Sequence, residues 1–238
     1  MRYTHLSFDL DGTLVDTAEE IAEAVNLTLA EFGVAERPLE EVTRLIGGGA
    51  HELMRRLIDR VNDERPADAT LLPIDDVLAR LDDHYAETAG TSGLPYADCV
   101  DSLKRLRAGG VRLVCLTNKE ERFARRVLQQ TGLDGYFELL IGGDTLPNKK
   151  PHRAVIEHVL ATLGGHADRY AHIGDSRTDI ETARNAAVAA WAVPYGYNAG
   201  EPIVDAMPDA LFASLADVAA HVIAANRLVP SPPGRGPG

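Results

Sequence analysis

The segment FDLDGTLVDT, residues 8–17, decides the fold of this chain. An apolar run, Thr4–Leu10, leads into it and predicts a buried β-strand. Asp9 and Asp11 lie where that strand should end, and Gly12 permits the chain to turn there. The two carboxylates can point toward one site beyond the strand only if the strand has ended and the chain is turning there. The segment therefore predicts a strand that ends in an acidic turn.

Beyond this segment, short apolar runs alternate with longer amphipathic ones, which is the pattern of a parallel α/β sheet. Further strands are predicted at Val111–Thr117, Glu138–Gly142, Tyr170–Gly174, Ala189–Val193 and Ala210–Ala213. Helices are predicted between them at Val100–Ala108, Glu120–Thr131, His152–Leu163, Asp179–Ala187 and Leu215–Asn226. The predicted fold class is α/β, with a Rossmann-like parallel sheet core flanked by helices.

Residues 17–93 break this alternation and show no strand pattern. Apolar residues recur there at helical spacing in three stretches, Ile21–Phe32, Leu53–Val61 and Val77–Tyr85. We therefore expect a helical cap domain, residues 17–93, inserted into a core domain made of residues 1–16 and 94–229. The Pro/Gly-rich end, residues 230–238, is expected to be a disordered tail.

The composition excludes several classes of partner. The 238 residues carry a formal net charge of -12, which repels nucleic-acid phosphates and anionic membrane surfaces. The chain reaches Asp9 before a signal-peptide core can form, and no apolar run approaches a membrane span. Two cysteines, Cys99 and Cys115, make no disulfide framework. We expect a cytoplasmic protein, a monomer or homodimer, with no nucleic-acid or membrane partner.

Polar residues follow four of the predicted strands near the point where each strand ends. In chain order they are Asp9 with Asp11, Thr117 with Asn118, Lys150, and Asp175 with Asp179 one helical turn later. Each alone is more often a turn, a helix cap or a solvated side chain. Ligands of parallel α/β sheets, however, bind outside the carboxyl ends of the strands. The convergence of these residues on one edge predicts a site there.

The acidic residues of the predicted site indicate that a cation is bound there. Asp9, Asp11 and Asp175 would bring like charges together, which is unfavourable unless a cation is bound. Oxygen ligands suit Mg²⁺, which usually takes one or two carboxylates plus substrate phosphate. No His or Cys grouping has the spacing of a zinc site. The predicted cofactor is Mg²⁺.

Four segments resemble the motifs of the haloacid dehalogenase-like superfamily, in that family's order: FDLDGTLVDT (8–17), LTNK (116–119), KKP (149–151) and GDSRTD (174–179). The insertion also falls where that family's first type of cap domain lies. Within the superfamily the chain is most similar to the phosphoglycolate phosphatases, through LIGGGAHELM (45–54), TNK and VPYGYNAGE (193–201). It departs from their usual pattern at Ala97, Arg153 and Ala187.

The resemblance implies a role for each polar residue. Asp9 would be the nucleophile that forms an aspartyl-phosphate, and Asp11 would protonate the leaving alkoxide and then deprotonate the attacking water. Lys150 would be a catalytic residue that neutralises charge, while Thr117 and the N–H of Asn118 would bind phosphate oxygens. Dehalogenation has no alkoxide to protonate, so an acid at position 11 favours phosphoryl chemistry.

The resemblance also implies the metal ligands. Mg²⁺ would be held by Asp9, the backbone carbonyl of Asp11 and Asp175, with Asp179 supporting them from outside the ligand set. In the cap, the free N–H groups of Gly48 and Gly49 at a helix start would bind a substrate carboxylate. The sequence equally allows that these glycines only make a tight turn.

The implied reaction is Mg²⁺-dependent hydrolysis of a small phosphomonoester, with 2-phosphoglycolate as the leading substrate. A sugar phosphomutase and a pyrophosphatase of the same superfamily are alternatives. A non-catalytic binding protein is a third alternative, from a different class. The intact set Asp9, Asp11, Thr117, Lys150 and Asp175 argues against it.

Overall fold

A computed structural model of the protein describes residues 1–66 and 70–228, so the tail predicted at 230–238 lies outside the described residues. The strands are β1 (His5–Phe8), β2 (Val15–Asp16), β3 (Leu94–Pro95), β4 (Arg112–Leu116), β5 (Leu139–Ile141), β6 (Tyr170–Gly174), β7 (Ala189–Ala192) and β8 (Ala210–Leu211). The α-helices are α1 (Ala18–Glu31), α2 (Leu39–Thr43), α3 (Ala50–Glu64), α4 (Ile74–Thr88), α5 (Cys99–Ala108), α6 (Glu121–Gln130), α7 (Ala154–Leu163), α8 (Arg177–Asn185) and α9 (Leu215–Arg227). Short 3-10 helices are η1 (Asp134–Tyr136), η2 (Ala167–Arg169) and η3 (Ile203–Ala206).

Strand β1 lies inside a parallel sheet with the order β5-β4-β1-β6-β7-β8. The chain goes from β1 to β4 and β5 on one side, and then crosses to β6, β7 and β8 on the other. Ligands of such sheets bind at this switch point, in the crevice beside the carboxyl ends of the strands. The sheet confirms the predicted α/β fold class and places the end of β1 at the crevice.

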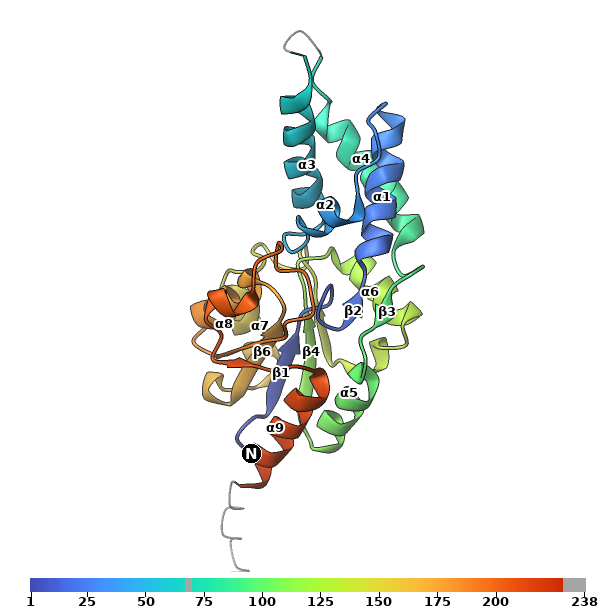
Figure 1. The fold of residues 1–238 in the computed structure, drawn as a ribbon. Coiled ribbons are helices and arrows are strands. Elements are labelled where there is room, and N and C mark those ends of the chain that lie inside the picture. The colour runs from blue at the N-terminus through green and yellow to red at the C-terminus, as the bar shows by residue number, and fades with distance from the viewer. Residues whose placement is uncertain (67–69, 229–238) are drawn as a thin grey trace, which may run out of the picture.

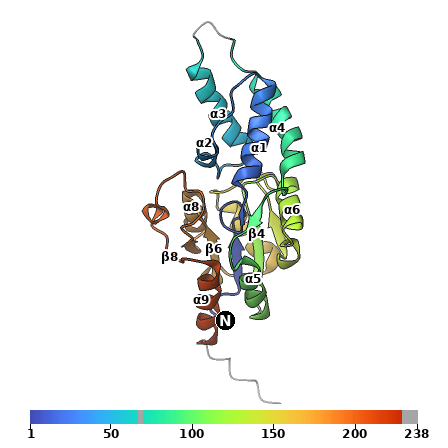
Figure 2. The same cartoon turned by 45° about the vertical axis from the view of Figure 1, so that its right-hand side comes forward.

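Helices cover the sheet on both faces (Figures 1 and 2). On one face, strand residues such as Leu6 and Leu113 join a cluster with residues of α5, α6 and α9. On the other, Val114 and Leu116 join a cluster with residues of α7 and α8. Successive residues such as Leu113 and Val114 thus serve opposite faces, as the pleat of a strand requires. This packing fixes where each strand ends.

Helices α1–α4 stand over the carboxyl edge of the sheet (Figures 1 and 2). Helix α1 packs against α2 and α4, and α3 packs against α4. The chain enters this layer after β2 and leaves it before β3. These two strands pair antiparallel, Val15 with Pro95 and Asp16 with Leu94. Both crossings between the layers therefore lie side by side, close to the acidic turn after β1.

The predicted strands coincide with β1 and β4–β8, and the predicted helices of the core with α5–α9, apart from residues at their ends. Helix α8 begins at Arg177, before the predicted Asp179, because Ser176 and Asp179 form a capping box at its start. Strands β2 and β3 were not predicted, since each has two residues and exists only through pairing between distant segments. None of the described helices is long and apolar enough to cross a membrane.

We propose that the helical layer, within residues 17–93, is a cap domain distinct from the core of residues 1–16 and 94–229. The layer has buried apolar residues of its own, among them Leu53, Leu57 and Leu81. Its hydrophobic cluster continues into the core, where Tyr85 of α4 packs on Phe123 of α6 with ring centroids 4.5 Å apart. The cap thus has an apolar core and an apolar contact with the sheet domain.

The substitution Leu57→Ala tests this division. It should lower the free energy of unfolding by about 2–5 kcal/mol, because it empties a fully buried site. If the cap is a separate domain, amide hydrogen exchange should accelerate in α1–α4 while β1, β4 and β6 keep their protection. Ile173→Ala, at a fully buried site in β6, is the matched control and should accelerate exchange in the sheet. Equal loss of protection throughout the Leu57→Ala protein would contradict the division.

Candidate active site

Asp9 is the first residue after β1 and lies at the centre of the crevice. Its N–H donates to the carbonyl of Ile173 in β6 at 2.9 Å, which extends the strand pairing by one residue. Its Oδ1 accepts from the N–H of Leu10 at 2.8 Å and lies 2.8 Å from Nζ of Lys150. Burial and neighbouring carboxylates raise the pKa of Asp9 to about 7, although Lys150 opposes the rise.

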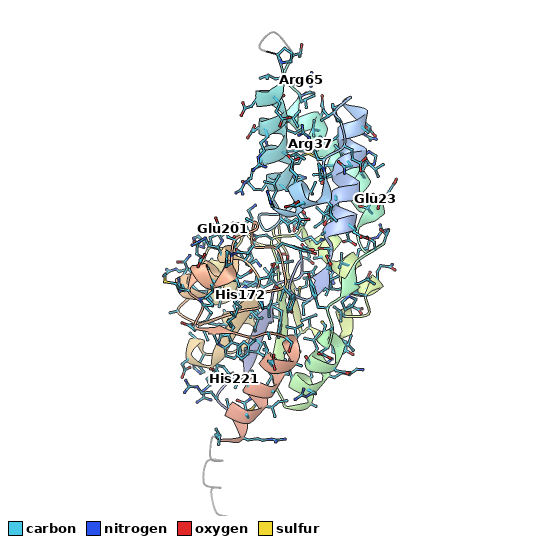
Figure 3. All side chains as sticks on the ribbon, in the orientation of Figure 1. Glu23, Arg37, Arg65, His172, Glu201 and His221 are labelled. Carbon is cyan, nitrogen blue, oxygen red and sulfur yellow. The ribbon has the colours of Figure 1, made fainter. Side chains whose placement is uncertain are left out.

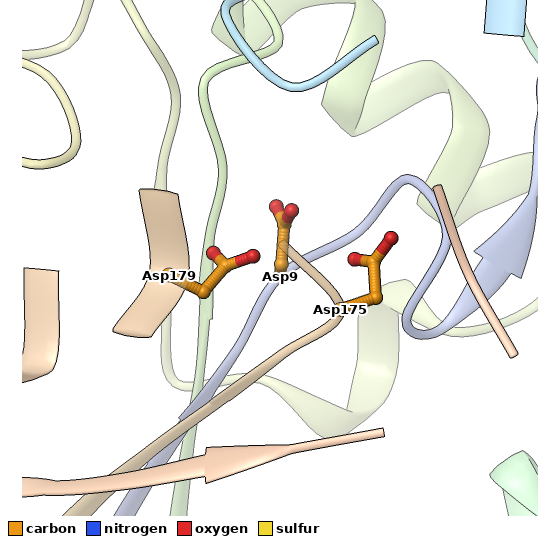
Figure 4. A group of neighbouring side chains, drawn as sticks. All are labelled: Asp9, Asp175 and Asp179. Carbon is orange, nitrogen blue, oxygen red and sulfur yellow. The ribbon is translucent and has the colours of Figure 1, made fainter. Parts of the chain in front are cut away.

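Asp175 follows β6 and lies beside Asp9 (Figure 4). Its Oδ1 accepts from the hydroxyl of Thr13 at 2.8 Å, and its Oδ2 accepts from the N–H of Tyr197 at 2.5 Å. A side chain at Gly12 or Gly196 would overlap this carboxylate, so glycine is required where the two loops close around it. Burial and the neighbouring carboxylates raise the pKa of Asp175 well above its ordinary value.

Asp179, in the first turn of α8, is held entirely by protein groups. Its Oδ2 accepts from the N–H and the hydroxyl of Ser176 at 3.1 and 2.6 Å. Its Oδ1 accepts from Lys150 at 2.6 Å and lies 3.1 Å from Nε2 of His172, a residue within the core domain (Figure 3). Burial alone would raise the pKa of Asp179, but Lys150 and His172 outweigh it and lower this pKa. Asp179 is therefore a fixed counter-ion of Lys150.

Lys150 is only 3% exposed, although it lies in a loop. Its ammonium bridges Asp9 and Asp179, at 2.8 and 2.6 Å. The side-chain amide of Asn118 donates to the carbonyl of Lys150 at 3.1 Å, which ties this loop to the end of β4. Burial alone would lower the pKa of Lys150, but the two carboxylates outweigh burial and raise it. Lys150 is thus a charged group fixed beside Asp9.

The buried acidic group fits a divalent cation. Asp9, Asp175 and Asp179 each offer a carboxylate oxygen, and these atoms lie within 4.8 Å of one another (Figure 4). Three carboxylates face the one ammonium of Lys150, which leaves excess negative charge in a buried place. Hard oxygen donors of this kind suit Mg²⁺. Asp179 already has four protein contacts, including the ammonium of Lys150, whereas each oxygen of Asp175 accepts a single hydrogen bond from a neutral group. Asp9 and Asp175 are therefore the better placed carboxylates to hold a cation.

The carboxylate of Asp11 is not part of this acidic group and pairs with a different lysine, Lys119. Its Oδ1 accepts from Nζ of Lys119 at 2.6 Å and from the hydroxyl of Thr17 at 2.7 Å. Lys119 is 2% exposed, and its ammonium also lies 3.9 Å from Oε1 of Glu20 and 5.0 Å from the ring centroid of Tyr85. Burial alone would lower the pKa of Lys119, but Asp11, Tyr85 and Glu20 outweigh burial and raise it.

Glu20 connects Lys119 to the crossings between cap and core. It lies in the first turn of α1 and is fully buried. Its Oε2 accepts from the N–H groups of Gly90 and Gly93 at 2.8 and 3.1 Å, in the segment that returns from α4 to β3. Its Oε1 has no hydrogen-bond partner among the described residues and faces the ammonium of Lys119. Glu20 therefore holds both crossings together and directs its remaining oxygen at the site.

The cap contacts the core beside the site. The amide of Asn118 donates to the carbonyl of Gly47 at 3.0 Å, and Lys149 donates to the carbonyl of Gly48 at 2.7 Å. Between cap and core lies a cavity of about 30 Å³, with room for about two water molecules. Its lining residues are Asp9, Asp11, Ile21, Ile46, Gly47, Gly49, Ala50, Leu53, Tyr85, Thr117, Asn118 and Lys119.

The structure thus gathers Asp9, Lys150, Asp175 and Asp179 into one buried group, with Thr117 and Asn118 at its edge. Asp11 is adjacent but separately held. Gly49 lines the cavity directly before α3, whereas Gly48 does not.

Sequence reasoning missed Lys119, Glu20 and His172. Lys119 belongs to the TNK segment and follows Thr117 at a strand end, which is a usable signal. For Glu20 the signal is weaker: it shares a helix face with the buried Ala24.

The family model for haloacid dehalogenase-like hydrolases matches residues 6–193. This protein belongs to that family. It is 37% identical to a phosphoglycolate phosphatase of Thiobacillus denitrificans, over 90% of this chain and 93% of the relative. It is also 37% identical to a phosphoglycolate phosphatase of Aliivibrio fischeri, over 86% of this chain and 89% of the relative. The crystal structure of a predicted phosphoglycolate phosphatase from Haemophilus somnus has a TM-score of 0.88 to this structure at 29% identity, and the match covers 93% and 98% of the two chains.

The raised pKa of Asp9 predicts how the metal-free protein responds to pH. An Asp with a folded pKa of about 7 and an ordinary value of 3.8 binds more protons in the folded state between these two values. Stability should therefore fall as the pH rises from about 4 to about 7, and Asp9→Asn should reduce this fall. Urea unfolding in EDTA at about pH 5 and about pH 8 measures the difference.

Mg²⁺ should then stabilise the wild-type protein at about pH 8, because it binds the folded state, and should stabilise Asp9→Asn much less. Asp134→Asn, at an exposed position, is the matched control and should behave as wild type. A wild-type protein whose stability is unchanged by Mg²⁺ would contradict a cation site at Asp9.

Proposed function

We propose that this protein is a Mg²⁺-dependent phosphomonoesterase that acts on a small phosphorylated metabolite through an aspartyl-phosphate at Asp9. Membership of the hydrolase family and the similarity to phosphatases support hydrolysis of a phosphoric monoester. One observation carries the assignment of roles. The two carboxylates after β1 have different partners, Lys150 for Asp9 and Lys119 with Thr17 for Asp11.

In the first step, a carboxylate oxygen of Asp9 attacks phosphorus, and the bond from phosphorus to the leaving oxygen breaks. Asp11 gives its proton to that oxygen, so that an alcohol leaves rather than an alkoxide. Lys150 stays between Asp9 and Asp179 and offsets negative charge as the nucleophile meets the phosphate. Asp179 keeps Lys150 in place through its four protein contacts.

In the second step, Asp11 takes a proton from a water molecule, whose oxygen attacks phosphorus. The bond from phosphorus to Asp9 breaks, which restores the carboxylate and releases inorganic phosphate. Thr117 and the N–H of Asn118, at the end of β4, would bind phosphate oxygens in both steps. The cap, which lines one side of the cavity, would limit the access of other water.

Asp9, Asp175 and the backbone carbonyl of Asp11 would hold the Mg²⁺ ion. When bound, the ion supplies positive charge that keeps Asp9 ionised and reduces its repulsion of a phosphate dianion. Asp175 is preset for this role by Thr13 and the N–H of Tyr197, which fix both of its oxygens.

The proposed substrate is 2-phosphoglycolate, which would give glycolate and phosphate. Support comes from the relatives, which are named phosphoglycolate phosphatases, and from the small closed cavity. The cavity lies between the cap and the core, so movement of the cap would widen it for the substrate to enter. The N–H groups at Gly48 and Gly49 before α3 remain candidates for its carboxylate, although only Gly49 lines the cavity.

Phosphate release across a panel of small phosphomonoesters tests this function. With Mg²⁺, 2-phosphoglycolate should be hydrolysed with the highest kcat/KM, and EDTA should abolish release. Asp9→Asn should lower kcat by at least about a thousandfold while the fold is retained, because the nucleophile is lost.

The alternatives give different results on the same panel. A mutase would accumulate an isomer of a sugar phosphate, and a pyrophosphatase would release two phosphates per pyrophosphate. A binding protein would release none. Activity that survives in Asp9→Asn would contradict the assigned nucleophile.

A further inference from the structure

The closed cavity has one polar wall and one apolar wall. The cap contributes Ile21, Ile46, Gly47, Gly49, Ala50, Leu53 and Tyr85, none of which has a charged side chain. The core contributes the polar residues after β1 and β4. Among the described residues that line the cavity, only Lys119 has a cationic side chain. Any second negative group on a bound phosphate ester therefore has Lys119 as its cationic partner.

The position of Lys119 follows from its contact with Asp11. In the proposed reaction Asp11 touches the leaving oxygen, and Nζ of Lys119 lies 2.6 Å from Oδ1 of Asp11. The carbon bonded to the leaving oxygen, and the group that this carbon carries, must then lie beside the same ammonium. A carboxylate on that carbon is separated from the leaving oxygen by two bonds, which suits this position.

We propose that Lys119 determines substrate specificity by pairing its ammonium with a carboxylate borne on the carbon next to the phosphate ester. The inference rests on the proposed function and narrows it: the substrate class is the small 2-phosphorylated carboxylates. Neutral phosphate esters of equal size are the class that Lys119 disfavours.

The surroundings of Lys119 suit this role. Its side chain is 1% exposed, so a charge-assisted hydrogen bond to it forms away from water and is stronger than one at a surface. Oε1 of Glu20 and the ring of Tyr85, both from the cap, lie 3.9 and 5.0 Å from the ammonium. Cap closure therefore completes the binding position. While Asp11 carries the proton that it gives to the leaving oxygen, it does not neutralise Lys119, and a substrate carboxylate can then pair with the ammonium. A neutral substituent cannot, and sites built to bind a polar group discriminate against analogues that lack it.

The two neighbouring lysines, Lys149 and Lys150, bind other groups of the protein. Lys150 lies between Asp9 and Asp179. Lys149 donates to the carbonyl of Gly48 and lies outside the cavity. Lys149 is therefore the matched control for Lys119, because it is a nearby lysine that contacts the cap and does not line the cavity.

The test compares 2-phosphoglycolate with 2-hydroxyethyl phosphate, which replaces the carboxylate by a neutral group. The measured quantity is the ratio of kcat/KM for the two esters, with Mg²⁺, in the full-length protein. Wild type should prefer 2-phosphoglycolate. Lys119→Met should reduce the ratio by at least about a hundredfold, because it removes one partner of a buried charge pair. Lys119→Arg should keep a clear preference, and Lys149→Met should keep the wild-type ratio.

Each other outcome has a definite meaning. Equal losses on both esters in Lys119→Met would show that Lys119 only positions Asp11 or supports the fold, and would overturn the inference. The wild-type measurement does not depend on how a variant folds: equal kcat/KM for the two esters would overturn the inference and leave the phosphatase function standing. Release of phosphate from neither ester nor from the wider panel would instead overturn the proposed function.

Discussion

The balance of buried charge at the end of β1 is the constraint on which the rest of the site depends. Asp9, Asp175 and Asp179 are all buried within reach of one another, and Lys150 is the ammonium that offsets them. One ammonium does not neutralise three carboxylates, so the pKa values of Asp9 and Asp175 are raised. Asp179 differs because Lys150 and His172 outweigh its burial and lower its pKa. A bound divalent cation would remove the imbalance, which is the physical reason that the proposed metal, Lys150 and the proposed nucleophile Asp9 lie together.

The second carboxylate, Asp11, is separated from this balance by a second lysine. Lys119 draws Asp11 toward the cap, and Glu20 links Lys119 to the segments that connect cap and core. Asp11, the proposed proton-transfer group, and the cap thus share one buried set of contacts. Glu20 of α1 and Tyr85 of α4 both lie beside the ammonium of Lys119, so the cap contacts the lysine that holds Asp11.

Most of the core fold could be predicted from local sequence. Strands such as β6 and helices such as α9 show their apolar patterns within their own residues, without reference to distant segments. The four strand-end motifs also predicted the group around Asp9, since parallel strands bring their carboxyl ends to one edge. The pairing of β2 with β3 was not predictable, because it joins segments on either side of the cap. The burial of Glu20 was not predictable either, because an acid in a first helical turn is normally solvated. Its hydrogen-bond donors, the N–H groups of Gly90 and Gly93, are remote in sequence. Lys119 was visible in its motif, but its pairing with Asp11 required the folded chain.

The most direct test of the account is to identify the covalent intermediate. The protein is mixed with 2-phosphoglycolate and Mg²⁺, quenched in acid during turnover, and reduced with borohydride, which converts an aspartyl-phosphate to homoserine. Peptide mass spectrometry then locates the modified residue. The account predicts homoserine at position 9, and none when Mg²⁺ is replaced by EDTA. Homoserine at Asp11 or Asp175, or turnover with no modified carboxylate, would contradict the central claim that Asp9 is the nucleophile.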